Sequence, residues 1–319
     1  MPAYPSIWLL GKDKEVVRYK GAKRADAFLH FLSRKSRPLI TEIKTGDQLN
    51  LFKTADETVF VAYLDPSDTD SRGAFERVAQ KYSDEFSFGI VSDQELAQTQ
   101  QNVKVPAVVG YKVIDGDVVI RKGEVGNVDE FEGWIKETSR GVIGELTLLN
   151  QQRLIDRAWP IVYLFAPTEK ERQKLRKTLY KFARSYYDSL TAVTVDPHEF
   201  PDLMSKLGLD PDCASPAGAV HQLSKDRIYP YPKGQPLTPG AIQNWGMDIY
   251  NGRVKPWTPP GSAKTAEGEK EEDDNNNNNN GFIKFTNKKN KVAAGTKRKV
   301  VSMANIPGVK IKIAGRDEL

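Results

Sequence analysis

The stretch Val105-Pro106-Ala107-Val108-Val109-Gly110-Tyr111 is followed by the turn Asp115-Gly116-Asp117 and by the second apolar run Val118-Val119-Ile120-Arg121-Lys122-Gly123. Two short β-rich runs joined by a tight turn predict a β-hairpin. An amphipathic helix is predicted next, from Val128 to Glu137. A residue before proline favours an extended backbone, and the X-Pro bond is a candidate for the cis form. The predicted unit is therefore proline, strand, strand, helix.

The same unit occurs twice more in the chain. One copy begins at Tyr4-Pro5-Ser6-Ile7 and predicts a helix from Arg24 to Arg34, and the other begins at Ser215-Pro216-Ala217 and predicts a helix from Pro239 to Tyr250. The candidate cis-prolines are thus Pro5, Pro106 and Pro216, which lie 101 (106 − 5) and 110 (216 − 106) residues apart. This spacing is about one domain length and too long for a solenoid, so we expect tandem copies of one small domain.

Two of the three copies are preceded by segments that complete a domain. Before Pro106 the sequence predicts strands at 41–43, 58–64 and 86–91, with helices at 47–53, 71–82 and 95–101. Before Pro216 it predicts strands at residue 146, 160–165 and 190–196, with helices at 151–157, 170–186 and 201–207. The order βαβαβα followed by ββα is that of the thioredoxin fold. We therefore expect an α/β fold of tandem thioredoxin-like domains, each with a mixed central sheet and helices on both faces.

The chain resembles the protein disulfide isomerase family. The residues that carry the resemblance are Tyr4-Pro5-Ser6-Ile7 with Tyr19-Lys20-Gly21, similar to the end of a catalytic a domain, and Ile249 to Pro256, similar to the exit of a noncatalytic b′ domain. The resemblance covers residues 2–257. It implies that residues 1–37 are the C-terminal remnant of an a domain whose first half is absent, that 38–138 are a b domain and that 139–258 are a b′ domain.

Residues 259–319 are expected to form a disordered, low-complexity tail. Within it an acidic stretch from Ala263 to Asp274 precedes the run Asn275–Asn280, and nine basic residues without an acidic one follow between Lys284 and Lys312. Such a composition does not supply a packed core. From Gly261 onward there are 12 Lys/Arg and 8 Asp/Glu, which leaves 35 (47 − 12) and 34 (42 − 8) before it. The net charge of +5 therefore comes mostly from the tail. The tail has no stacking aromatics between its basic residues beyond Phe282 and Phe285, so we expect no nucleic-acid partner.

Thiol chemistry in this family needs Cys-x-x-Cys at a helix N-terminus. The chain has one cysteine, Cys213, so it cannot form an internal dithiol. We therefore expect no catalytic residue and no cofactor in this chain. The neighbours Asp210 and Asp212 disfavour a thiolate. We interpret Cys213 as a structural thiol, with a reactive thiol that forms mixed disulfides with clients as the alternative.

No metal site is expected either. The three histidines, His30, His198 and His221, with the single cysteine do not supply the four ligands of a zinc site. The trio Asp65, Asp68 and Asp70 lacks the following Gly and Glu of a calcium loop, so we interpret it as a polar loop. The chain also has no phosphate-binding loop, nucleophile elbow or dinucleotide fingerprint.

The resemblance implies that the b′ domain is the main client-binding unit, through an apolar groove beside its third helix. Leu203 and Leu207 on that helix would line the groove, and Leu223 and Ile228 on the adjoining strands would complete it. Lys206 stands where the family favours an apolar residue. The alternative is that the four apolar residues are plain core. The expected partners are unfolded or partly folded client proteins.

The last four residues, Arg316-Asp317-Glu318-Leu319, match the endoplasmic reticulum (ER) retention sequence in all but the first residue. They imply the ER lumen, with the retention receptor as a further partner. No secretory signal peptide precedes residue 20, and an absent N-terminal piece would carry both that peptide and the Cys-x-x-Cys. No apolar stretch approaches the ~20 residues of a membrane span, so membrane insertion is not expected.

The sequence thus predicts an ER protein of the isomerase family that binds clients without exchanging disulfides. One alternative is a fragment of an active thiol–disulfide isomerase whose Cys-x-x-Cys half is missing. Another is a thioredoxin-like adaptor outside the ER, with Lys297-Arg298-Lys299 in a basic tail. Residues 2–37 contain two strands and one helix of an incomplete fold. We expect them to stay exposed rather than to dock on the next domain.

Overall fold

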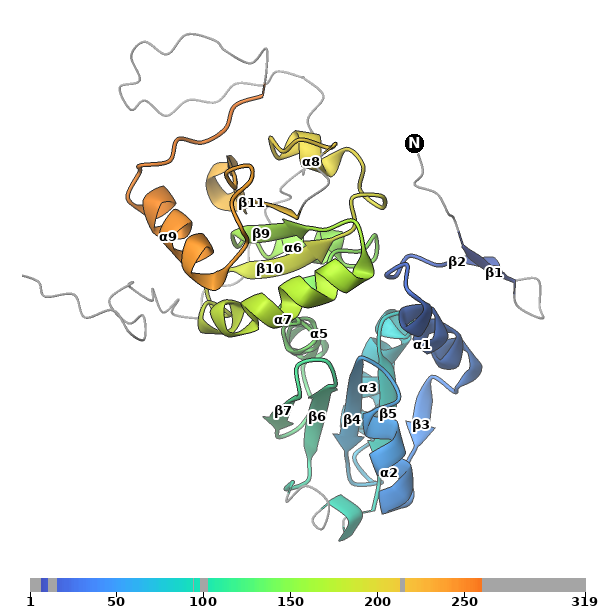
Figure 1. Cartoon of the computed structure of the whole chain (residues 1–319). Helices are drawn as coiled ribbons and strands as arrows, with labels where there is room; N and C mark the ends of the chain where they lie inside the picture. The colour runs from blue at the N-terminus through green and yellow to red at the C-terminus, as the bar shows by residue number, and fades with distance from the viewer. Residues whose placement is uncertain (1–6, 11–15, 94, 98–102, 213–215, 260–319) are drawn as a thin grey trace, which may run out of the picture. The chain divides into compact units, whose positions relative to one another are not determined.

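The computed structural model describes residues 7–10, 16–93, 95–97, 103–212 and 216–259, and Figure 1 draws them in colour. Residues Met1–Thr258 form one compact unit, and of the residues after them only Pro259 is described. This compact unit contains two five-stranded sheets, each with its own helices. We call residues 40–138 the first repeat and residues 143–250 the second repeat. An N-terminal segment (residues 7–36) precedes them.

The first repeat has a mixed sheet in the strand order β3-β5-β4-β6-β7. Strands β3 and β4 run parallel to β5, whereas β6 pairs antiparallel with β4 and β7 antiparallel with β6. The strands are β3 (Ile40–Glu42), β4 (Thr58–Tyr63), β5 (Ser87–Val91), β6 (Ala107–Lys112) and β7 (Asp117–Lys122), and the helices are α2 (Gly46–Lys53), α3 (Thr69–Tyr82) and α5 (Val128–Thr138).

The central strand β4 shows why this sequence forms a layered domain. All six of its residues are buried, as expected for a strand covered on both faces. Because side chains alternate along a strand, Phe60 and Ala62 enter one apolar cluster with residues of α3 and α5. Val59, Val61 and Tyr63 enter the opposite cluster with residues of α2. The predicted arrangement, with helices on both faces of a central sheet, is confirmed.

The second repeat has the strand order β12-β11-β9-β10-β8 and repeats the pairing directions of the first. Strands β8 and β9 run parallel to β10, and β11 and β12 form the antiparallel half. The strands are β8 (Ile143–Glu145), β9 (Ile161–Phe165), β10 (Thr191–Val195), β11 (Ala217–Gln222) and β12 (Arg227–Pro230), and the helices are α6 (Gln151–Asp156), α7 (Glu169–Ser185), α8 (Leu203–Lys206) and α9 (Pro239–Tyr250).

Three sequence expectations differ locally from the structure. Leu146 follows β8 instead of lying in it, and the helix predicted at 201–207 is reduced to the single turn α8. Leu223 lies in a 3₁₀ turn, Leu223–Lys225, and not on a strand. The reason is a left-handed residue, Asp226 (φ 48°), which reverses the chain before β12 begins. The predicted helix 95–101 is described only at residues 95–97, which are helical.

The candidate cis-prolines fall partly outside the described residues. The bond between Val105 and Pro106 is cis. Pro5 and Ser215, the residue before Pro216, lie outside the described residues. The same holds for Cys213 and for the terminal residues Arg316 to Leu319.

The N-terminal segment consists of the antiparallel pair β1 (Trp8–Leu10) and β2 (Val16–Arg18) and the helix α1 (Ala25–Ser36). Our expectation that the whole segment stays exposed is wrong for α1. Its Phe31 is 4% exposed, and the Arg34 guanidinium donates to both carboxylate oxygens of buried Asp56 in the first repeat, at 2.8 and 2.7 Å. Phe31 packs against Tyr19 and Phe28 of the same segment, whereas ion pairs of Arg34 and Lys35 join the helix to the first repeat. The expectation holds for the strand pair, where Trp8 and Leu10 are 57% and 71% exposed.

Candidate functional site

The four predicted client-binding residues lie together in the second repeat. Leu207 belongs to the apolar cluster between the sheet and α8, and Leu203, Leu223 and Ile228 pack against that cluster while remaining partly exposed. Leu207 itself is 2% exposed, so it supports this surface from below and does not line it. We call the half-buried residues Leu203, Leu223 and Ile228, with Leu207 beneath them, the apolar face.

The end of α8 fixes the position of this face. Leu207 is the C-cap, and Gly208 follows it with φ of 73°, a conformation that glycine adopts without strain. Gly208 N–H donates to Ser205 O (3.1 Å), and Leu209 N–H donates to Met204 O (2.9 Å). These two bonds constitute a Schellman motif. Gly208 therefore ends this helix.

Trp257 lies on the apolar face, a contact that the sequence did not predict. Its backbone N–H donates to Ile228 O at 2.7 Å, and the two residues form an isolated antiparallel bridge. Its indole lies so close to Gly208 that a Cβ added there would be 2.6 Å from indole Cδ2. An aromatic residue directly after the exit sequence Lys255-Pro256 was the available indication. The segment that leaves the second repeat therefore folds back over part of the face.

The helices that follow the central strands carry no thiol at their N-termini. Asp68 caps α3 by accepting a hydrogen bond from Ser71 N–H (3.0 Å). Thr168 caps α7 in a capping box with Glu171. The carboxylate of Asp68 and the hydroxyl of Thr168 accept hydrogen bonds from the N–H groups of the first helical turn. In a thiol oxidoreductase, a reactive cysteine stands at such a helix N-terminus, which lowers the pKa of its thiol. These positions are therefore built for helix stability.

Behind the α7 N-terminus lies a buried ionic cluster. Arg172 Nη1 is 3.2 Å from Asp196, and its Nε is 3.2 Å from Glu169 and 3.7 Å from Glu145. Burial raises the pKa of the Glu145 carboxyl above its usual range, although three arginines oppose this shift. Burial also raises the pKa of nearby Glu199 to about 7. The cluster holds charges that water hardly reaches.

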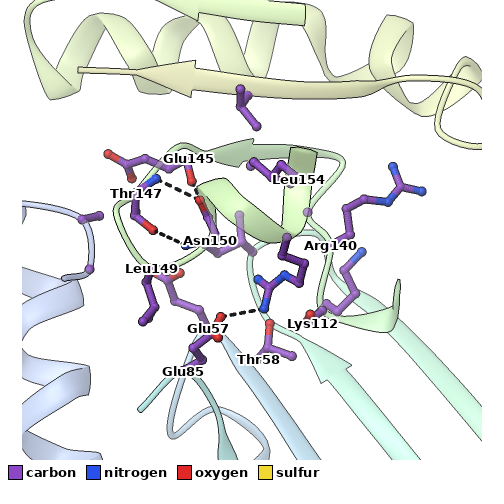
Figure 2. Close-up of a pocket in the computed structure, with 18 of the residues that line it drawn as sticks. Glu57, Thr58, Glu85, Lys112, Arg140, Glu145, Thr147, Leu149, Asn150 and Leu154 are labelled. Atoms are coloured by element: carbon purple, nitrogen blue, oxygen red, sulfur yellow. Dashed lines mark hydrogen bonds and ion pairs between the residues drawn. The ribbon is translucent and has the colours of Figure 1, made fainter. Parts of the chain in front are cut away.

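A charged cleft of about 1110 Å3 adjoins this cluster. It is lined by residues of α1 and of both repeats, and Figure 2 shows Glu57, Glu85 and Lys112 of the first repeat opposite Glu145 and Asn150 of the second. The Asn150 side chain accepts from Thr147 N–H (2.9 Å) and donates to Glu145 O (2.8 Å), which holds this loop in shape. Across the cleft, Arg153 Nη1 pairs with Glu85 at 2.7 Å. None of the four apolar-face residues lines the cleft.

The chemistry of the cleft is that of paired charges. Arg157 and Arg140 both pair with Glu137 and both lie over the Trp159 ring. The paired cations hold the pKa of the Glu137 carboxyl below its usual range against the opposing effect of burial. No cysteine is found among the described residues that line the cleft. The ion pairs that line the cleft join residues of the first repeat to residues of the second.

Within the described part of the chain, no group of three or more His, Cys, Asp or Glu residues is placed to hold a metal ion. Asp65 accepts from the Ser67 backbone and hydroxyl, and Asp68 serves as the cap of α3, so the predicted polar loop has structural roles. His221 lies on β11, 2.9 Å from Asp226. Across the same residues, no helix combines the length and apolar character needed to cross a membrane.

Comparison with known proteins agrees with this architecture. The family described as thioredoxin-like domain matches residues 64–248. Protein disulfide-isomerase from Humicola insolens is 32% identical over 254 residues, covering 79% of this chain and 49% of the relative. Protein disulfide-isomerase from Aspergillus niger is 25% identical over 253 residues, covering 79% and 48%. In fold, the chain is similar to the crystal structure of the bb fragment of ERp72, with a TM-score of 0.54 at 14% identity, covering 69% of this chain and 100% of that one.

The described residues thus define a protein of tandem thioredoxin-like domains. The chain belongs to the protein disulfide isomerase family. It spans about half the length of the curated relatives it matches. The resemblance inferred from the sequence is therefore correct at the level of the family.

Proposed function

We propose that this chain is a protein disulfide isomerase-like protein of the ER lumen that binds unfolded or partly folded proteins through its second repeat, without exchanging disulfides. The observation that carries the proposal is the apolar face, where Leu203, Leu223 and Ile228 remain partly exposed around a buried support. An extended apolar segment gains ~25 cal/mol for each Å2 it buries there. The relatives are isomerases by name, which favours a protein-folding role.

The size of the face limits the affinity. Three half-buried side chains offer a small contact area, and ordering an unfolded segment costs part of the gain. We therefore expect dissociation constants in the micromolar range or weaker. Weak binding suits a protein that releases its clients without an energy source.

Peptide binding tests the proposal directly. A fluorescently labelled, unfolded apolar peptide is titrated with the full chain, with the double variant Leu203→Asp and Leu223→Asp, and with Leu51→Asp as a matched control. Leu51 is 74% exposed on α2 of the first repeat, so its variant adds a charge far from the apolar face. The double variant should bind at least fivefold more weakly and remain folded by circular dichroism. Unchanged affinity in the folded double variant would remove the apolar face as the binding site.

The absence of thiol exchange has its own test. Release of a mixed disulfide needs a second thiol, and the only cysteine in the sequence is Cys213. Insulin reduction by this chain should therefore be no faster than with Cys213→Ser. A rate that disappears in the serine variant would contradict this part of the proposal.

The ER assignment rests on Arg316-Asp317-Glu318-Leu319 together with the family. We expect the native protein to remain in the ER and to be secreted when Leu319 is deleted from it. Native protein found in the cytosol or nucleus would favour the adaptor alternative.

A second candidate function is that of a segment of an active isomerase, favoured by the match to about half of each relative. In that case the dithiol belongs to a longer native protein, and the apolar face would still bind clients. Intact-mass measurement of the native protein separates the two candidates. A mass well above that of 319 residues, with a peptide that contains Cys-x-x-Cys, would establish the second.

A further inference from the structure

Helix α7 carries a row of lysines on the face opposite to its core residues. Leu175, Leu179 and Ala183 are buried in the second repeat, whereas the row Lys170, Lys174, Lys177 and Lys181 is exposed throughout. The spacings of four, three and four residues keep these lysines on one side of a helix. Figure 1 shows α7 as the long helix of the second repeat. We call this row the lysine face.

The lysine face is not neutralised within the described part of the chain. The arginines of the same helix are paired, Arg172 with Asp196, Arg176 with Glu169 and Arg184 with Asp117. In contrast, none of the four lysines has an ion pair with a carboxylate of a described residue. Like charges four residues apart destabilise a helix, and a cation in the first turn opposes the helix dipole. An anionic partner would relieve both effects.

The shape of the row indicates a single extended chain. Eleven residues at 1.5 Å each separate the outer lysines by roughly 16 Å along the axis, which an extended chain spans with about five residues. The row is one side chain wide, and the exposed residues between its members, Gln173 and Thr178, are uncharged. Leu175, Leu179 and Ala183 are buried in the core and Phe182 packs against it, so α7 presents no exposed apolar stripe to a lipid surface. No aromatic side chain belongs to the row, so bases would find no stacking partner there.

We propose that the lysine face of α7 is a docking surface for an acidic, extended segment of a partner protein. Carboxylates placed along about five residues would each meet an ammonium group. The surface lies on α7, away from the apolar face on α8, β12 and the 3₁₀ turn, so the two sites use different elements of one repeat. It would recruit a partner by charge while the apolar face holds an unfolded segment.

Two charge-matched quadruple variants test this site. The first replaces the lysine face, with Lys170→Gln, Lys174→Gln, Lys177→Gln and Lys181→Gln. The control replaces four exposed lysines scattered over the chain, with Lys44→Gln, Lys104→Gln, Lys122→Gln and Lys255→Gln. Both lower the net charge from +5 to +1, and glutamine has nearly the helix propensity of lysine. Binding of labelled hexaglutamate to the full chain is measured by anisotropy in 50 mM NaCl.

We expect the lysine-face variant to bind hexaglutamate at least tenfold more weakly than the unchanged chain and the scattered variant to lose less than twofold. Lysine-to-arginine replacements at the same four positions keep the positive charges and should retain binding, and circular dichroism checks that the glutamine variant remains folded. Equal binding by the unchanged chain and the lysine-face variant would overturn the proposal. An equal loss in both quadruple variants would overturn it too, since binding would then follow net charge. Tighter binding of hexathymidylate, or of vesicles containing phosphatidylserine, would overturn the assignment to a protein partner.

Discussion

Arg24 Nε lies 3.1 Å from Glu145 Oε2, which joins the N-terminal segment to the second repeat. The same guanidinium pairs with Glu57 of the first repeat through its Nη2 atom. Arg24 is 13% exposed and Glu145 is 10% exposed, so both charges are largely withdrawn from water. One side chain therefore connects three parts of the chain, each otherwise built from its own strands and helices.

Replacement of Arg24 by methionine should lower the free energy of unfolding by about 2 kcal/mol, because a charge left buried without its partner is costly. Glu145 retains Arg172 and Arg176 at 3.7 Å, which limits the loss. Urea denaturation followed by circular dichroism gives the value. The further change Glu145→Gln should restore part of it.

Arg253→Met provides the control, because Arg253 and its partner Asp248 are both exposed. A surface pair of this kind contributes about 0–1 kcal/mol. If the two methionine variants had the same free energy of unfolding, the Arg24–Glu145 contact would contribute no more to stability than a surface ion pair.

Hydrogen exchange should divide the N-terminal segment in two. The amides of α1 around Phe31 should exchange slowly, because the helix is fixed to the first repeat through Arg34 and Asp56. The amides of Trp8 to Leu10 should exchange within seconds, because a two-stranded sheet alone is marginal in water. Mass spectrometry resolves the two regions, and Arg34→Ala should accelerate exchange in α1 alone. Uniform protection across both regions would show that β1 and β2 are also stably packed.

The architecture could be predicted from the sequence because it depends on local patterns. The run from Thr58 to Leu64 is almost continuously apolar and rich in β-forming residues, and Thr58–Tyr63 forms a strand buried on both faces. The segment Pro239 to Tyr250 begins with a proline and forms α9 as predicted. The repeated proline-strand-strand-helix unit then specified the number of sheets. Such patterns concern residues close in sequence, so they need no knowledge of tertiary contacts.

The contacts between distant residues could not be predicted in the same way. Arg24 and Glu145 are charged residues 121 (145 − 24) positions apart, and nothing in either local sequence indicates the other. The structure brings Leu203, Leu223 and Ile228 together and buries Leu207, as the alternative of a plain core allowed for that residue. The sequence did not indicate that Trp257 lies on the face. Burial and coverage are properties of the folded chain and follow only from its tertiary structure.

The contact between Gly208 and Trp257 can be measured with a double-mutant cycle. Gly208→Ala should lower the free energy of unfolding by about 2–3 kcal/mol, since the new Cβ meets the indole and alanine disfavours a positive φ. With Trp257→Ala present, the clash is absent and only the backbone cost of about 1–2 kcal/mol should remain. Trp257→Ala alone should also tighten peptide binding, because it uncovers part of the apolar face. Additive effects in the cycle would show that the two residues do not interact.

Glu199 should make the unfolding free energy depend on pH. Burial raises the pKa of its carboxyl from 4.5 to about 7. The positive charges of Lys23 and, more weakly, Arg172 oppose this shift, whereas the negative charges of Asp196 and Glu145 add to it. A carboxyl with a raised pKa in the folded state binds its proton more tightly there than in the unfolded chain. The contribution of Glu199 to the free energy of unfolding is therefore complete below pH 4.5 and is lost as the pH rises to about 7. The difference corresponds to at most about 3 kcal/mol.

The variant Glu199→Gln separates this effect from all other titrations. It should match the unchanged chain at pH 4.5 and be more stable at pH 8, by up to about 3 kcal/mol, because the amide is never ionised. Glu130→Gln, at an exposed carboxylate on α5, serves as the control. Urea denaturation at pH 4.5, 6, 7 and 8 gives the curve. The opposite result would be a Glu199→Gln variant that is less stable than the unchanged chain at pH 8. It would mean that Lys23 and Arg172 stabilise the ionised carboxylate and that burial is not the dominant influence on its pKa.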